Sequence, residues 1–133
     1  YNSYIQIIDI NMYKNTFNNL KEGKSSWLWH FDNHPNEFIK IMIYLTDVDE
    51  NSAPFEIIVD NNNNPIKLNS SKYSLEDWNK NNDIQYFKNQ YNGNRIPNET
   101  IVDLCNKGYK KKKICGKKGT IILFSENIIH RAT

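Results

Sequence analysis

The sequence has few cysteines, no long apolar run and no secretory signal pattern at its start. Its two cysteines, Cys105 and Cys115, are too few for a disulfide framework and are not spaced as a CxxC metal site. We therefore expect reduced thiols and a cytoplasmic protein. No apolar stretch approaches the roughly 20 residues that cross a bilayer, so we expect no membrane association.

Glycine and proline are also scarce, at five and four residues. Because aromatic residues and isoleucine recur along the whole chain, we expect a folded protein rather than a disordered one. The formal net charge of +2 gives no strong field towards nucleic acid, and the lysine run at 110–113 is expected to be a solvated loop. The length predicts a single domain, residues 1–133, which we expect to be truncated at both ends.

Apolar residues predict a mainly β protein. The expected strands cover 4–11, 25–31, 38–45, 55–59, 120–124 and a segment that begins at Ile128. Residues 61–118 are expected to form a partly helical insertion, with a capping box at Ser74 and a second short helix capped by Asn98. Strands on both sides of a helical insertion predict a β-sandwich or barrel that carries a lid.

A histidine and an aspartate two residues apart form the clearest chemical feature. On an extended segment, His30 and Asp32 point to the same side. A second histidine would complete the two-histidine, one-carboxylate set that binds iron and leaves coordination positions open. His34 is followed by Pro35 and is expected in a loop, whereas His130 ends an apolar segment that can lie alongside His30.

The same spacing also occurs by chance in many proteins. In that alternative, His30 is a partly exposed histidine, Asp32 is a turn residue and His130 is a surface residue near a chain end. Spacing alone does not separate this interpretation from a metal site, so the surrounding sequence has to decide.

The residues around the three candidate ligands form an ordered set of motifs. These are WHFD at 29–32, FIKIMIYLTDVD at 38–49, APFE at 53–56, NRIPNE at 94–99, and GTIILF at 119–124 with His130 and Arg131. In this order they resemble the phytanoyl-CoA dioxygenase family, many members of which carry a WHxD motif, a KxxxYLTDV strand and a GPF turn. The resemblance spans roughly residues 26–133.

The resemblance implies a double-stranded β-helix, which is the cupin-like jelly roll. It also implies an enzyme that uses Fe(II), 2-oxoglutarate and O2 to hydroxylate a small organic molecule. His30 and Asp32 match the proximal metal ligands of the family and His130 matches the distal one. We therefore expect these three residues to be both metal-binding and catalytic.

The sequence departs from the family pattern at three places. The basic residue that anchors 2-oxoglutarate usually follows the distal histidine by about ten positions, which places it beyond Thr133; Arg131 is expected to point away from His130. Ala53 replaces the glycine of the GPF turn, a mild change unless the turn needs positive φ. An asparagine run at 60–64 replaces a turn that is common at the substrate rim.

Four further residues are weaker site candidates. Tyr44 matches an aromatic position that often lines the cosubstrate pocket, although a core tyrosine fits equally well. Lys40 shares its face with Tyr44 and can meet a carboxylate, although edge-strand lysines are common. Asn11 is a third candidate for cosubstrate binding. Arg95 is the best basic candidate for substrate contact, with a surface role as the alternative, and Trp29 is expected to pack.

Three functions stay open on the sequence alone. The first is the Fe(II)- and 2-oxoglutarate-dependent hydroxylase of a small molecule. The second is a metal-binding jelly-roll module without turnover, because the expected anchor is absent and the rim is altered. The third is a cupin-type metal enzyme that does not use 2-oxoglutarate, for which His34 is the only support. The substrate and the oligomeric state are not indicated.

Overall fold

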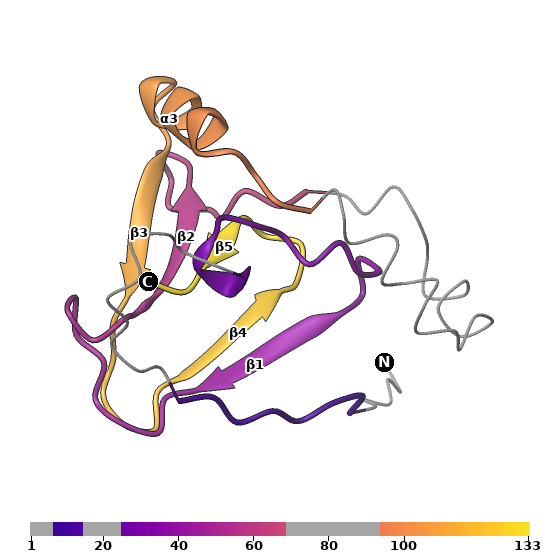
Figure 1. Ribbon diagram of the computed structural model, residues 1–133, viewed down its shortest axis with the longest axis vertical. Coiled ribbons are helices and arrows are strands. Elements are labelled where there is room, and N and C mark those ends of the chain that lie inside the picture. The colour runs from indigo at the N-terminus through magenta and orange to yellow at the C-terminus, as the bar shows by residue number, and fades with distance from the viewer. Residues whose placement is uncertain (1–6, 15–24, 69–93) are drawn as a thin grey trace.

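The computed structural model describes residues 7–14, 25–68 and 94–133, and this part of the chain is mainly β (Figure 1). Its elements are η1 (Ser25–Trp27), β1 (Ile39–Ile43), β2 (Phe55–Val59), α3 (Asn98–Asn106), β3 (Lys110–Ile114), β4 (Ile121–Ser125) and β5 (His130–Arg131). Among the described residues, no helix is both long enough and apolar enough to cross a bilayer.

The strands form two antiparallel sheets (Figure 1). β1 pairs with β4, with Ile41 opposite Leu123. The second sheet has the order β3-β2-β5, and Ile57 in its central strand lies opposite His130 on one side and Lys112 on the other. Alternating side chains give each sheet an inner and an outer face, and the outer face of β1 is apolar but exposed, with Ile41 64% accessible.

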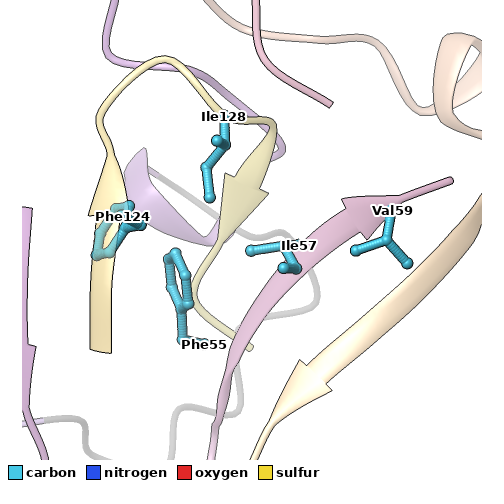
Figure 2. Packing of buried hydrophobic residues seen from close by; sticks show 5 residues of the cluster. All are labelled: Phe55, Ile57, Val59, Phe124 and Ile128. Carbon is cyan, nitrogen blue, oxygen red and sulfur yellow. The ribbon is translucent and has the colours of Figure 1, made fainter. Parts of the chain in front are cut away.

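One hydrophobic core lies between the two sheets (Figure 2). It consists of Phe55, Ile57, Val59, Phe124 and Ile128. Figure 2 shows the side chains from β2 facing Phe124 of β4 and Ile128 of the turn that follows it. The rings of Phe55 and Phe124 lie 4.6 Å apart, and each fully buried side chain of this kind contributes about 1.5–3 kcal/mol of transfer free energy.

A second core covers the opposite face of β2. Trp29, Ile58, Ile101 and Ile129 form it, and α3 contributes Ile101, which is 1% exposed. Because both faces of β2 are covered, every residue of that strand is buried. This explains why the sequence of β2 has the nearly continuous apolar character of an interior strand.

Most of the strand predictions are confirmed. The segment 55–59 coincides with β2, and the segments 38–45 and 120–124 contain β1 and most of β4. The prediction for 25–31 was wrong in part, because η1 is a short 3-10 turn and only His30 pairs in an extended ladder. Residues 7–11 take no regular structure, since no described strand pairs with them; 4–6 lie outside the described residues.

The prediction of a solvated loop at 110–113 was wrong. These lysines belong to β3, whose backbone pairs with β2 over the whole length of both strands. The lysine side chains are exposed, as an edge strand allows, and the buried partner strand supplies the ladder that the lysines do not predict. The predicted insertion 61–118 therefore includes the strand β3 as well as a helix.

The second predicted helix is confirmed as α3, although its start differs. Asn98 is the first residue of the helix rather than its cap; Pro97 takes the capping position with φ −57° and ψ 146°, and no side chain caps the helix. The capping box at Ser74 lies outside the described residues.

Candidate metal centre

Backbone pairing brings the two ligand histidines side by side. The amide of His30 donates to the carbonyl of His130 at 3.0 Å, and the amide of His130 donates back to His30 at 2.9 Å. His130 is also opposite Ile57 of β2. Residues that are directly opposite in an antiparallel ladder project to the same face. The two imidazoles consequently meet, with ring centroids 4.3 Å apart.

Asp32 joins the histidines because it is two residues further along the same extended segment. Its amide donates to the carbonyl of Glu126 at 3.0 Å, in the turn before β5. The Nε2 atom of His30 lies 3.7 Å from Oδ1 of Asp32, and the Nε2 atom of His130 lies 3.8 Å from Oδ2. One ligand atom from each residue lies within 4.8 Å of the other two, so the three residues can hold a metal ion.

In both ligand histidines, a contact between Nδ1 and the carbonyl two residues earlier fixes the orientation of the imidazole. Nδ1 of His30 lies 2.7 Å from the carbonyl of Leu28, and Nδ1 of His130 lies 2.9 Å from the carbonyl of Ile128. A carbonyl only accepts, so each Nδ1 carries the proton and donates it. The lone pair of each Nε2 is then directed towards Asp32, as a metal-binding histidine requires.

Burial sets the protonation states of the site. Burial, with His130 next to it, lowers the pKa of His30 to about 4, and Arg95 adds to the effect. Burial among Phe55 and Phe124 also lowers the pKa of His130. Both histidines are thus neutral at pH 7, which is the state that binds metal.

Asp32 is the charged member of the set. Burial alone would raise the pKa of its carboxyl, but Lys40 and the two histidines outweigh burial and lower it. Nζ of Lys40 lies 2.5 Å from Oδ2 of Asp32, and the pKa of Lys40 is raised because the pairing outweighs its own burial. Lys40 therefore holds one carboxylate oxygen, which leaves Oδ1 on the side of His30.

A second carboxylate extends this network. Oε1 of Glu126 lies 3.7 Å from Nζ of Lys40, and Oε2 contacts Nδ1 of His34. Next to it, the fully buried amide of Asn127 accepts from the amide of His34 at 3.1 Å and donates to the carbonyl of His34 at 2.8 Å. The loop after Asp32 is thus fastened to the turn before β5.

The donor set fits a divalent transition metal. Two imidazole nitrogens and one carboxylate oxygen suit iron, zinc and their neighbours, and donors at about 2.1 Å from one ion lie roughly 3.0–3.4 Å apart. The separations of 3.7 and 3.8 Å are slightly wider, so a small inward shift of Asp32 would complete the site. The sequence-predicted ligands His30, Asp32 and His130 are brought together, whereas His34 contacts Glu126 instead.

Of the three residues predicted to bind cosubstrate, Tyr44 and Asn11 lie outside the ligand group and Lys40 contacts it. The hydroxyl of Tyr44 donates to the carbonyl of Ile114 at 2.6 Å and accepts from the amide of Phe55 at 3.3 Å, so it joins the end of β1 to β2 and β3. The exposed side chain of Asn11 donates to Asp9. Lys40 is in the site but is bound to Asp32.

Arg131 lies on the face opposite the metal ligands, as its place next to His130 predicts. Its Nε donates to Oε2 of the buried Glu56 at 2.7 Å, and its guanidinium carbon lies 4.5 Å from the ring centre of Trp29. The expectation that Trp29 packs is confirmed, since it is 2% exposed. Ala53 has φ 55°, a backbone conformation that favours glycine and strains an L residue.

Sequence reasoning missed Glu126 and Asn127. Both are polar residues in a short turn between β4 and β5, where exposed residues are usual. Both are nevertheless buried, at 8% and 0% exposure. The signal that could have found them is their position four and three residues before the distal histidine, since a turn that delivers a ligand needs fixed partners.

The chain was compared with protein-family models, curated proteins and solved structures, and none of them matches it. The site therefore rests on its geometry: the two histidines are buried, Asp32 is partly buried, and the three residues can hold a metal ion.

Proposed function

We propose that this chain is an Fe(II)- and 2-oxoglutarate-dependent oxygenase with a double-stranded β-helix fold, which hydroxylates a small organic molecule. The observation that carries the proposal is the convergence of two Nε2 atoms and one carboxylate at a buried position. Two antiparallel sheets with the ligands at their inner face support the fold. The ordered motifs that resemble the phytanoyl-CoA dioxygenase family support the cosubstrate.

In this proposal, His30, Asp32 and His130 would hold Fe(II), and a set of three protein ligands would keep coordination positions open for cosubstrate and oxygen. Iron and 2-oxoglutarate together supply the oxidising chemistry when they are bound. The protein contributes neutral imidazoles in a fixed orientation and a carboxylate that Lys40 keeps ionised. Phe55 and Phe124 beside His130 keep water away from one side of the site.

The test uses the full-length protein that contains residues 1–133. Purified without metal and then supplied with Fe(II), it should consume 2-oxoglutarate in the presence of O2, and His30→Ala should abolish both consumption and stoichiometric iron binding. The matched control is His34→Ala, which removes a nearby imidazole that is not part of the ligand set. Unchanged iron stoichiometry in His30→Ala would contradict the proposal.

A metal-binding module without turnover is the second candidate. It is favoured because neither Lys40 nor Arg131 is placed to anchor 2-oxoglutarate. Lys40 is bound to Asp32 and Glu126, and Arg131 faces the other side of the sheet. Stoichiometric iron binding with no affinity for 2-oxoglutarate in the Fe(II) protein would favour the module. A calorimetric titration of 2-oxoglutarate under anaerobic conditions separates the two.

A further inference from the structure

Arg95 lies directly opposite His30, on the edge of the ladder that carries the metal ligands. The amide of Phe31 donates to the carbonyl of Asn94 at 3.2 Å, and the amide of Ile96 donates to the carbonyl of Trp29 at 2.9 Å. These two bonds frame His30 and Arg95 as a non-hydrogen-bonded pair, the type with the closer Cα atoms, about 4.5 Å apart.

Side chains of such a pair project to the same face of the ladder. His30 has His130 on one side and Arg95 on the other, so these three side chains form one row. The side chain of Arg95 therefore leaves the backbone next to a metal ligand, on the face where the metal would lie. This places a cation within reach of an anion that is bound beside the ion.

Arg95 is exposed, and within the described ranges its side chain forms no hydrogen bond or ion pair. The contrast with the other arginine of the sequence is direct, because Arg131 is bound to Glu56 and stacked on Trp29. Lys40 is bound to Asp32. Of Arg95, Arg131 and Lys40, Arg95 is the one whose side chain has no hydrogen-bond acceptor among the described residues.

A mostly apolar groove borders Arg95. It has a volume of about 250 Å³ and is lined by Leu28, Trp29, Arg95, Ile96, Pro97 and Asn98. Its walls come from the two segments that pair at His30 and Arg95, so the groove borders the ladder that carries a metal ligand. A groove of this size and character accommodates a short aliphatic or aromatic group.

We propose that Arg95 binds the carboxylate of the organic substrate, whose apolar part lies in this groove. This inference rests on the proposed function and names its substrate class as a small apolar carboxylic acid. A planar guanidinium binds a carboxylate through two parallel hydrogen bonds, which a lysine cannot do. 2-Oxoglutarate has a carboxylate at each end and no apolar body, so it leaves the groove unfilled.

The first experiment measures binding of hexanoate and of the neutral hexanamide to the metal-free protein by NMR titration. Without metal, direct coordination of the carboxylate cannot contribute. Arg95→Gln should weaken hexanoate binding about tenfold or more and leave hexanamide unchanged, and Arg95→Lys should weaken it by less. Lys111→Gln is the control for loss of one surface charge, because Lys111 is an exposed residue of β3.

The second experiment separates the two sources of a carboxylate. The Fe(II) protein and its Arg95→Gln variant are titrated anaerobically with 2-oxoglutarate, and unchanged affinity supports the assignment to the substrate. A loss of 2-oxoglutarate affinity in Arg95→Gln with unchanged hexanoate binding would overturn it. Equal hexanoate binding in Arg95→Gln and the parent, with both folded by circular dichroism, would also overturn it.

The two proposals fail separately. If the Fe(II) protein does not consume 2-oxoglutarate but hexanoate binding still depends on Arg95, the oxygenase proposal fails and the carboxylate site stands. If 2-oxoglutarate is consumed and hexanoate binding does not depend on Arg95, the oxygenase stands and the carboxylate site fails.

Discussion

His30 and His130 are bonded to each other by both of their backbone amides, at 3.0 and 2.9 Å, and each directs its Nδ1 at the carbonyl two residues earlier. One pairing thus fixes the separation, the tautomer and the direction of both imidazoles. The site does not depend on long flexible side chains, because backbone hydrogen bonds set its geometry.

Asp32→Asn should weaken Fe(II) binding by at least about 100-fold, since the variant keeps the shape of the side chain but removes the anionic ligand. It also leaves Lys40 without its nearest carboxylate. Anaerobic calorimetry measures the affinity. Asp47→Asn is the matched control, because Asp47 is exposed and pairs with Lys117; an equal loss in both variants would contradict the assignment.

Acid should destabilise the metal-free protein between about pH 6.5 and pH 4. The pKa of His30 falls from 6.5 in the unfolded chain to about 4 in the fold, so the unfolded state binds more protons in this window and stability falls as pH falls. The shift corresponds to at most about 3–4 kcal/mol. His130 acts in the same direction in this window, because burial also lowers its pKa, whereas the lowered pKa of Asp32 acts only below its ordinary value of 3.8.

Urea unfolding at a series of pH values measures this effect. His30→Gln should flatten the dependence, because it removes one buried group that must stay neutral. Stability that is independent of pH from 6.5 to 4 would show that the histidines are not buried as neutral groups.

Metal uptake at pH 7 should release almost no protons from the ligands. Both histidines are already neutral and Asp32 is already ionised, so no ligand has to lose a proton to bind the ion. Calorimetric titrations with Co(II) in buffers of different ionisation enthalpy measure the number of protons. A release close to one or two protons per ion would contradict the protonation states described above.

Asn127→Ala should cost about 2–4 kcal/mol of stability and weaken metal binding. The amide of Asn127 is fully buried and bonds to two backbone groups of His34 and to the side chain of Asn36, so its loss removes three hydrogen bonds that tie two loops together. Chemical denaturation checks the stability. The exposed Asn62→Ala should change it by less than about 0.5 kcal/mol, and equal effects would argue against the network.

Tyr44→Phe should destabilise the fold by about 1–3 kcal/mol and leave 2-oxoglutarate affinity unchanged. The hydroxyl donates to the carbonyl of Ile114 and accepts from the amide of Phe55, and these two hydrogen bonds join strands. Denaturation and anaerobic titration give the two readouts. A large loss of cosubstrate affinity with little change in stability would instead favour the cosubstrate role that the sequence pattern suggests.

The sequence was most informative where a buried face imposes a pattern. β2 could be predicted to the residue because both of its faces are covered, β1 because its residue types alternate, and most of β4 because it is a continuous apolar run. The edge strand β3 could not be predicted: its lysines have no apolar pattern, and its order comes from hydrogen bonds to β2.

The ligands could be predicted only from the two-residue spacing of His30 and Asp32 together with the ordered motifs around them, because the spacing alone also occurs by chance. The residues that hold the ligands in place could not be predicted. Glu126, Asn127 and the pairing of Lys40 with Asp32 depend on contacts between segments far apart in the chain, which spacing does not encode.

The most direct test of the metal centre is the iron stoichiometry of three proteins in anaerobic equilibrium dialysis. The parent protein and His34→Ala should each bind one Fe(II) per chain, and His130→Ala should bind none at the same free concentration. Equal stoichiometry in His130→Ala and the parent, or no binding by the folded parent, would contradict a site formed by His30, Asp32 and His130.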